Sequence, residues 1–150
     1  MRTDLVSNHK VTMFQYPDRL QAQTLVTTSR DMYHAITTPA GHYEKNRSML
    51  IIMPVHEWGR DGTITITVQH SNDNTTFTTL ATLSAASAGA APTVYIADVH
   101  DFRRYVRLSC VIAGGSEGNV YFEFCILGVC AIPNRAPVYQ EGTELTVTYA

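Results

Sequence analysis

The sequence predicts an all-β protein: an antiparallel, jelly-roll-like β-sandwich of about eight strands with extended N- and C-terminal arms. β-branched and aromatic residues come in short runs that Gly, Pro, Asn and Asp separate. Within the clearest runs, apolar residues alternate with polar ones, which is typical of strands with one buried face. The length of 150 residues suits one domain with a single core.

The charge and the hydropathy of the sequence argue against two kinds of partner, nucleic acids and membranes. The formal net charge is -2 and the pI is near 6.3, whereas a nucleic-acid-binding domain needs a basic face. No stretch approaches the roughly 18 apolar residues that cross a bilayer, and Met1-Arg2-Thr3-Asp4 lacks the apolar run of a secretion signal. We therefore expect no nucleic-acid partner, no membrane, and synthesis in a cytosol.

The two ends of the chain differ in composition from its middle. Both are polar, punctuated by Pro, and carry isolated aromatics at Phe14, Tyr16 and Tyr139. The predicted organisation is an N-terminal arm over residues 1–20, a sandwich over 21–132, and a C-terminal extension with a last strand over 133–150. Arms with aromatic anchors hook neighbouring subunits. Disordered tails, or tails packed on their own domain, are the alternative interpretation.

Period-2 patterns and turn residues place the strands along the chain. In order, they are predicted at Val11–Gln15, Leu25–Thr28, Met49–Val55, Thr63–Gln69, Thr75–Leu83, Thr93–Ala97, Arg103–Ile112, Val120–Leu127 and Leu145–Tyr149. In the clearest one, Ile64, Ile66 and Val68 alternate with threonines. His70 to Asn74 then supplies turn residues, so the fourth and fifth strands form a hairpin. Leu83 to Pro92, rich in small residues, is predicted as a loop.

A second hairpin is predicted from Phe102 to Leu127, with its turn in the Gly-rich stretch Ala113 to Asn119. Its inward rows are Val106, Leu108, Cys110 and Ile112 on one strand, and Val120, Phe122, Phe124 and Ile126 on the other. Its outward rows include Tyr105, Val111, Tyr121, Cys125 and Leu127, which are too apolar for a free surface. We therefore expect a second layer, an arm or another subunit to cover that face.

The three cysteines are odd in number and lack CxxC spacing, so they are predicted to be buried thiols. Cys110 and Cys125 fall on the two strands of the second predicted hairpin. A disulfide between them would require a register that sets them opposite each other.

A search for catalytic and metal-binding patterns predicts a protein that is not an enzyme and needs no cofactor. The six histidines are scattered singly, without the spacing of a zinc site. Ala113 to Gly118 is Gly-rich, but it joins two strands and does not open a helix as a phosphate-binding loop does.

Two groups of residues are candidate contacts with a partner. Trp58, the single tryptophan, lies in a predicted turn among charged residues, where it either anchors a partner or caps the sandwich. Arg103, Tyr105 and Arg107 alternate on one strand face. They form either a docking patch or a solvated edge paired with acids such as Glu123.

Three features from Thr63 onward occur in a characteristic order: a Thr/Ile strand that enters a Ser-Asn-Asp-Asn turn (ITVQHSNDNTTFTTL), a small-residue loop, and an arginine-bounded strand with a Gly-rich turn (FRRYVRLSCVIAGG). This order, over roughly the second half of the chain, resembles the capsid decoration, or cement, proteins of tailed bacteriophages. Residues 1–47 depart from that pattern, because they are longer and more irregular than a short lead-in strand.

The resemblance implies a β-sandwich that binds the outer surface of an assembled shell and strengthens it. The implied partners are the major capsid protein and further copies of this chain, as a homo-oligomer for which we favour a trimer. The implied location is the capsid exterior of the virion, after synthesis in the host cytoplasm. The candidate capsid or subunit contacts are Phe14, Tyr16, Trp58, Arg103, Tyr105, Arg107 and Tyr139.

Two other functions fit the same sequence. One is a carbohydrate-binding jelly roll that stacks sugars on Trp58, Tyr43 or Tyr95. The other is a head-to-tail or tail component of a phage.

Overall fold

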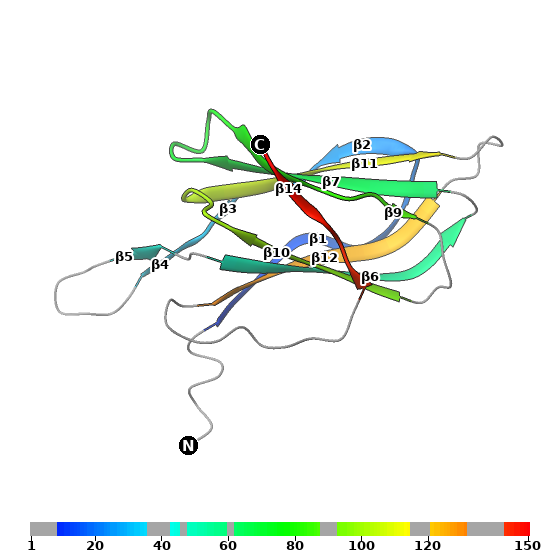
Figure 1. Cartoon of the computed structure of the whole chain (residues 1–150), viewed down its shortest axis with the longest axis horizontal. Helices are drawn as coiled ribbons and strands as arrows, with labels where there is room; N and C mark the ends of the chain where they lie inside the picture. The colour runs from blue at the N-terminus through cyan, green and yellow to red at the C-terminus, as the bar shows by residue number, and fades with distance from the viewer. Residues whose placement is uncertain are drawn as a thin grey trace, which may run out of the picture.

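Two sheets packed face to face make up the computed structural model of the protein, which describes residues 9–35, 43–45, 48–59, 62–87, 93–114, 121–131 and 143–150 (Figure 1). Sheet A, the lower one in the figure, has the order β1-β12-β6-β10-β13. Its strands are β1 (His9–Gln21), β6 (Ser48–Gly59), β10 (Thr93–His100), β12 (Tyr121–Ala131) and β13 (Thr143–Glu144).

Sheet B has the path β14-β8-β7-β11-β2, and two short strands pair beside it, β3 with β11 and β9 with β7. Its strands are β2 (Gln23–Val26), β3 (Arg30–Asp31), β7 (Gly62–Ser71), β8 (Thr78–Leu83), β9 (Ala86–Ser87), β11 (Tyr105–Gly114) and β14 (Val147–Tyr149). A separate hairpin, β4 (Tyr33–Ala35) with β5 (Tyr43–Lys45), projects from one end of the sandwich (Figure 1).

The strand order confirms the predicted jelly roll. Eight principal strands form two four-stranded layers, β1-β12-β6-β10 and β2-β11-β7-β8. Along the chain, consecutive principal strands alternate between the layers at every step except from β7 to β8. That alternation makes the double-layered arrangement of a jelly roll. The part of the chain that the structure describes contains no helix long and apolar enough to span a membrane.

One predicted hairpin is confirmed and the other is wrong. β7 and β8 pair antiparallel around a turn in which Asn74 has a φ of 60°. β11 and β12, by contrast, lie in different sheets: β11 pairs with β7 and β2, and β12 pairs with β1 and β6. The Phe102–Leu127 segment is therefore a crossing between the layers. The alternation in each strand looks the same in both arrangements, because each strand buries one face in the same core.

Because β11 and β12 lie in different layers, the predicted positions of the cysteines relative to one another also change. Cys110 and Cys125 lie in opposite layers and form no disulfide. Cys110 and Cys130 are buried, and Cys125 is half-buried on the outer side of sheet A. Burial raises the pKa of the Cys110 thiol to about 12, so this side chain is an inert apolar filler of the core.

The core lies between the sheets, where alternate residues of every long strand meet. The buried rows predicted for β7 and β11 are observed, as are Phe122, Phe124 and Ile126 of β12. Thr27 lies in the kink between β2 and β3. Its hydroxyl accepts a hydrogen bond from the Leu108 N–H at 3.0 Å, so this buried donor is satisfied where the strand pairing is interrupted.

The predicted short strand Val11–Gln15 is part of β1, and the predicted N-terminal arm is wrong for residues 9–20, which form most of this edge strand. β1 pairs with β12 from His9–Ala131 to Gln21–Tyr121. Phe14, predicted as a contact with a partner, is only 4% exposed and belongs to the core. Its ring lies against Gly128, where an added Cβ would come within 2.6 Å of Phe14 Cε2 and 2.7 Å of Met49 Sδ. The polar residues and proline that suggested an arm are compatible with an edge strand.

The C-terminal residues bridge the two layers along one side (Figure 1). β13 pairs with β10 in sheet A, and β14, within the predicted last strand, pairs with β8 in sheet B. Between them, Leu145 is buried and its N–H donates to the Ile96 carbonyl at 2.8 Å. The C-terminal extension therefore closes the side of the sandwich between β10 and β8.

The turn after β7 is held by one carboxylate. Asp73 Oδ1 accepts hydrogen bonds from the Ser71 hydroxyl at 2.7 Å and from the Thr75 and Thr76 N–H groups at 2.8 Å each. These donors favour the charged form and lower the pKa of Asp73 from 3.8 to about 2.

We expect Asp73→Asn to change how stability depends on pH. Because the folded-state pKa is depressed, the contribution of Asp73 to stability is fully present above its ordinary pKa of 3.8, and it is lost as the pH falls to about 2. The wild-type protein should therefore melt above the variant near pH 6, and the difference should narrow between pH 4 and pH 2. Thermal unfolding of both proteins across this pH range measures the difference in melting temperature. A difference that stays constant with pH would contradict the stabilising role of the Asp73 carboxylate.

Candidate interaction surface

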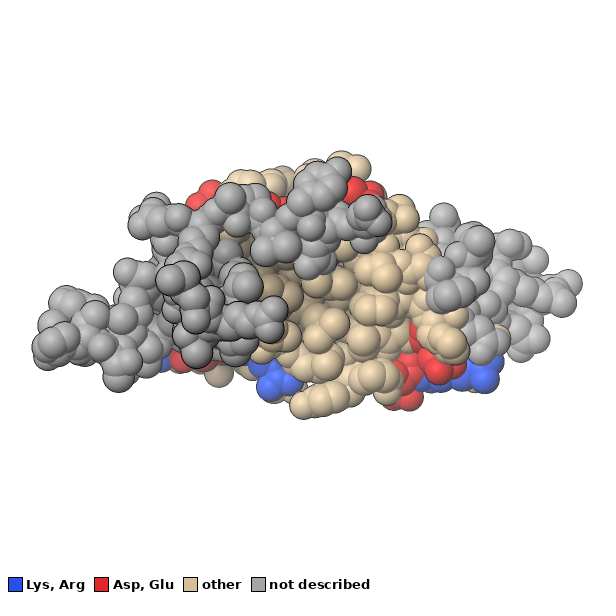
Figure 2. Space-filling view, turned by 90° about the horizontal axis from the view of Figure 1, so that it is seen from below, with Lys and Arg blue, Asp and Glu red and all other residues tan. Residues whose placement is uncertain are grey.

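The outer face of sheet A is apolar although it lies on the surface of the sandwich. Its residues alternate with the buried rows of β1, β12, β6 and β10, and each is half-buried or exposed. The apolar ones are Met13, Leu50, Ile52, Pro54, Val94, Ile96, Cys125, Leu127 and Val129, and the same outward rows also contain Gln15, His56, Asp98 and Glu123. Figure 2 shows this face: its centre is uncharged wherever the described residues are seen, and charged side chains gather at its margins.

The outer face of sheet B has a different character. The outward row of β7 is Thr63, Thr65, Thr67 and Gln69, as the sequence predicted. Opposite these residues, β11 presents Ala113, Val111, Ser109 and Arg107. Hydroxyl and charged groups interact well with water, so this face suits free solvent. An apolar patch on one layer alone indicates a surface that contacts a partner.

A hollow of about 380 Å³ lies within the outer face of sheet A. Its lining comes from all four principal strands of that sheet: Pro17, Pro54, Val55, His56, Thr93, Val94, Glu123, Phe124 and Cys125. The volume is at the lower end of the range of small-molecule pockets, about 300–1,000 Å³, and most of the lining is apolar.

Two β-bulges, one on each side of β12, lie at the hollow. In the β1–β12 pairing the register shifts between Gln15 and Asp18, so Tyr16 and Pro17 together face the single residue Cys125. In the β6–β12 pairing one extra residue, His56, lies between the pairs Val55–Phe124 and Glu57–Glu123. Bulges redirect side chains out of the regular alternation. These two bring Pro17 and His56 to the rim of the hollow.

The lining of the hollow contains few ionisable side chains. It contains one carboxylate, Glu123, and one imidazole, His56. Burial raises the pKa of the Cys125 thiol, so this side chain is neutral and apolar near pH 7. The Arg19 guanidinium stacks over the Tyr121 ring, 3.7 Å from its centroid, at the same end of the sheet. The hollow therefore suits an apolar group that carries a single hydrogen-bond donor.

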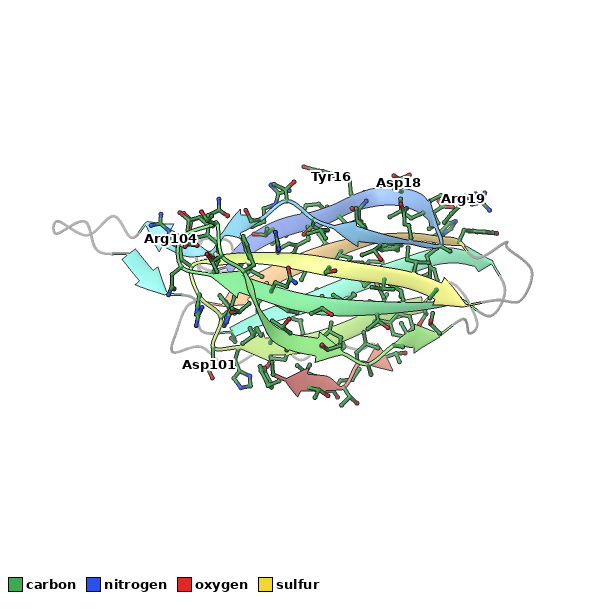
Figure 3. The ribbon with its side chains drawn as sticks, turned by 90° about the horizontal axis from the view of Figure 1, so that it is seen from above. Tyr16, Asp18, Arg19, Asp101 and Arg104 are labelled. Atoms are coloured by element: carbon green, nitrogen blue, oxygen red, sulfur yellow. The ribbon has the colours of Figure 1, made fainter. Side chains whose placement is uncertain are left out.

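Tyr16 adjoins Pro17 of the lining but does not itself line the hollow. Its side chain is 66% exposed, and Figure 3 shows Tyr16, Asp18 and Arg19 along the outer edge of β1. A tyrosine this exposed on an edge strand is available as an anchor for another molecule.

The predicted Arg103, Tyr105 and Arg107 group lies on the other layer, where Arg107 has partners within the chain. Arg107 Nε donates to Gln69 Oε1 at 2.7 Å, and its guanidinium lies 4.0 Å from the centroid of the Phe77 ring. Arg103 is exposed in the corner before β11, and Tyr105 is half-buried at the start of that strand.

The adjoining Arg104 forms the ion pair of this corner. It donates to both carboxylate oxygens of Asp31, with Nη2 to Oδ2 at 2.8 Å. Glu123, considered as the acidic partner of the arginines, lies in sheet A instead. β11 pairs with β7 on one side and with β2 and β3 on the other, so the arginine group lies on an interior strand and not at a sheet edge, and a docking patch remains a prediction.

The structure distributes the predicted contact residues over several places. Tyr16 is on the edge of sheet A, Phe14 is in the core, and the arginine group is on sheet B. Trp58 lies in β6, where it pairs with Phe122, and its side chain is outside the described residues, as is all of Tyr139. Tyr95, considered for sugar stacking, is 8% exposed and points into the core, so it cannot stack on a ligand.

The hollow was missed at the sequence level, although part of its signal was present. The outward row of β12 was recognised as too apolar for a free surface, and Cys125 and Leu127 belong to it. Pro17, Pro54 and Val94 come together only through strand pairing and bulges, which leave no mark on a single strand. The described residues contain no group of three or more His, Cys, Asp or Glu side chains arranged to hold a metal ion.

Comparison with known proteins supports the fold. No family model and no curated protein matches the sequence. The PBSX exported protein XepA has a similar structure, with a TM-score of 0.55 and 18% identity over 94% of this chain. This chain spans 43% of the XepA chain, and at this identity the likeness shows the β-sandwich fold alone.

Two more distant structures were also found. A xylanase 10B from Clostridium thermocellum, with CBM22-1 and GH10 modules and bound xylohexaose, gives a TM-score of 0.44 and 13% identity over 89% of this chain and 30% of its own. The Eiger TNF of S. frugiperda gives a TM-score of 0.37 and 14% identity over 89% of this chain and 99% of its own.

Proposed function

We propose that this chain is a structural, non-catalytic protein that binds the outer surface of a bacteriophage capsid and strengthens the shell. The observation that carries the proposal is the apolar outer face of sheet A, which contrasts with the hydroxylated outer face of sheet B. The resemblance of the chain from Thr63 onward to capsid decoration proteins supports the same role. The partners are then the major capsid protein and other copies of this chain.

In this role the protein reinforces the shell mechanically. A rigid sandwich lays an uncharged face on the shell, and each copy removes apolar surface from water on both partners. Many copies on one lattice each make a modest contact, and together they resist the outward pressure of the packaged genome. Rigidity matters because a flexible domain would lose conformational entropy each time it bound.

Particles with and without the protein test the role directly. Both are exposed to heat or to low ionic strength, and DNA release is followed over time. Particles that lack the protein should release DNA earlier. Equal release from both particles would exclude a cement role, and counting copies per particle by quantitative gel separates a shell protein from a ring-shaped tail component.

The face itself is tested by a charge placed at its centre. Ile52 of β6 is opposite Leu127 of β12 in the middle of the outer face of sheet A. Ile52→Lys should reduce the number of copies that bind to particles lacking the protein, with an affinity loss on the order of tenfold or more, because the lysine must be desolvated at the contact.

The matched control is Thr65→Lys, a half-buried position in the middle of the outer face of sheet B. It should bind as the wild type does. Circular dichroism melting of both variants confirms that each is folded. Equal losses in the two variants would show that sheet A has no special part in binding.

A further inference from the structure

The exposed tyrosine and the hollow beside it lie within one patch of the surface. The β1 bulge that turns Pro17 into the lining turns Tyr16 outward, so one irregularity of the chain makes a projection and a cavity side by side. The tyrosine does not fill the hollow of its own chain, since it is 66% exposed.

We propose that Tyr16 of one copy inserts into the hollow of a second copy, and that this contact assembles the protein into a homo-oligomer. The inference rests on the self-association that the proposed function includes, and it names the contact that produces it, which can be measured in the absence of any shell.

The chemistry of the hollow matches a phenol. Its walls are apolar, formed by Pro17, Pro54, Val94 and the neutral Cys125 thiol, and they accept an aromatic ring. Glu123 in the lining offers a carboxylate that accepts a hydrogen bond from the phenol hydroxyl. A tyrosine is therefore a better occupant than a purely aliphatic side chain, which would leave that carboxylate desolvated and unpaired.

The position of the two features suits self-association. A projection and a cavity in the same patch allow two identical copies to contact each other through identical surfaces, as a closed two-fold symmetric pair requires. Aromatic anchors seated in pockets contribute a large share of interface energy. The rest of the outer face of sheet A, around Ile52 and Leu127, remains available for a larger partner.

The oligomeric state of the purified full chain tests the contact. Light scattering after size exclusion, across a series of concentrations, should show a pair for the wild type. Tyr16→Ser should raise the dissociation constant on the order of thirtyfold. The control is Val11→Ser, on the same strand and 64% exposed, which should leave association unchanged. A monomeric wild type, or a Tyr16→Ser variant that still associates fully, would overturn the proposal.

The hollow is tested independently by a matched pair of valines. Val94 lines the hollow and is 38% exposed, whereas Val111 is 40% exposed on the outer face of sheet B. Val94→Arg should abolish association, and Val111→Arg should not. Melting curves check that both variants fold. If Val94→Arg does not fold, the Tyr16→Ser variant still tests the contact.

Mixing the two defective proteins gives the sharpest outcome. Tyr16→Ser lacks the projection but has an intact hollow, and Val94→Arg has the projection but a blocked hollow. At concentrations below the raised dissociation constant of Tyr16→Ser, neither variant should associate alone, but the mixture should, because one functional contact is restored between unlike copies. A mixture that stays monomeric would count against the insertion of Tyr16, whereas the shell-binding role is decided separately on particles.

Discussion

Replacing Gly128 by alanine is expected to lower the free energy of unfolding by roughly 1–3 kcal/mol, the usual cost of overpacking a core. Gly128 is buried in β12, and a Cβ there would lie 2.6 Å from Phe14 Cε2 and 2.7 Å from Met49 Sδ. Neither distance is compatible with a real methyl group, so the Phe14 ring or the Met49 side chain must move. Urea unfolding of the wild type and the variant measures the loss.

The contact between Phe14 and Gly128 provides a control experiment for this prediction. In a Phe14→Leu background the aromatic ring is gone, so the same Gly128→Ala change should cost less than in the wild type. A double-mutant cycle of the two changes should therefore show coupling. If Gly128→Ala is neutral, or costs the same in both backgrounds, the close packing of β1 on β12 at this point is wrong.

The second large effect is expected at Phe102, where the chain turns from sheet A into sheet B. Phe102 is 1% exposed and follows Asp101, which has a φ of 59°. Phe102→Ala should cost about 3–5 kcal/mol, because it removes a ring from the core and leaves a cavity that the fixed corner cannot close. Thermal or urea unfolding measures it.

Phe77 provides the comparison for Phe102. It is half-buried at the surface, with the Arg107 guanidinium over its ring. Phe77→Ala should therefore be clearly less destabilising than Phe102→Ala, since water can fill the space that the ring leaves. Similar losses in the two variants would mean that the corner relaxes freely around Phe102.

Strand positions could be predicted from the sequence because alternation is a local property. The Ile64, Ile66 and Val68 row had to face a core whatever its neighbours were, and the eight strands then limited the fold to a double-layered sheet. The partner of each strand is not a local property. A Gly-rich connection between β11 and β12 is compatible with a hairpin and with a crossing between layers, and only the packing of the whole chain decides between them.

Because strand pairing depends on the whole chain, residues 9–20 were predicted as an arm although they belong to a strand of sheet A. Pro17 and its polar neighbours interrupt the alternation of β1, and such interruptions suggest an arm when a segment is considered by itself. In the fold they are bulge residues on an edge, where backbone groups need no second partner. The hollow depends on this bulge and on a second one at His56, so the candidate site was beyond sequence prediction for the same physical cause.

The pairing of β1 with β12 has a consequence for how the protein is made. Lys10 pairs with Cys130, so β1 is synthesised before its only sheet neighbour among the described strands, β12, which follows all the other principal strands of the sandwich in the chain. Until then Phe14 has no core to enter, and its exposed strand is a site for chaperones or for misassociation. A slow step should therefore separate formation of the β7–β8 hairpin, which is local, from the docking of β1 that completes sheet A.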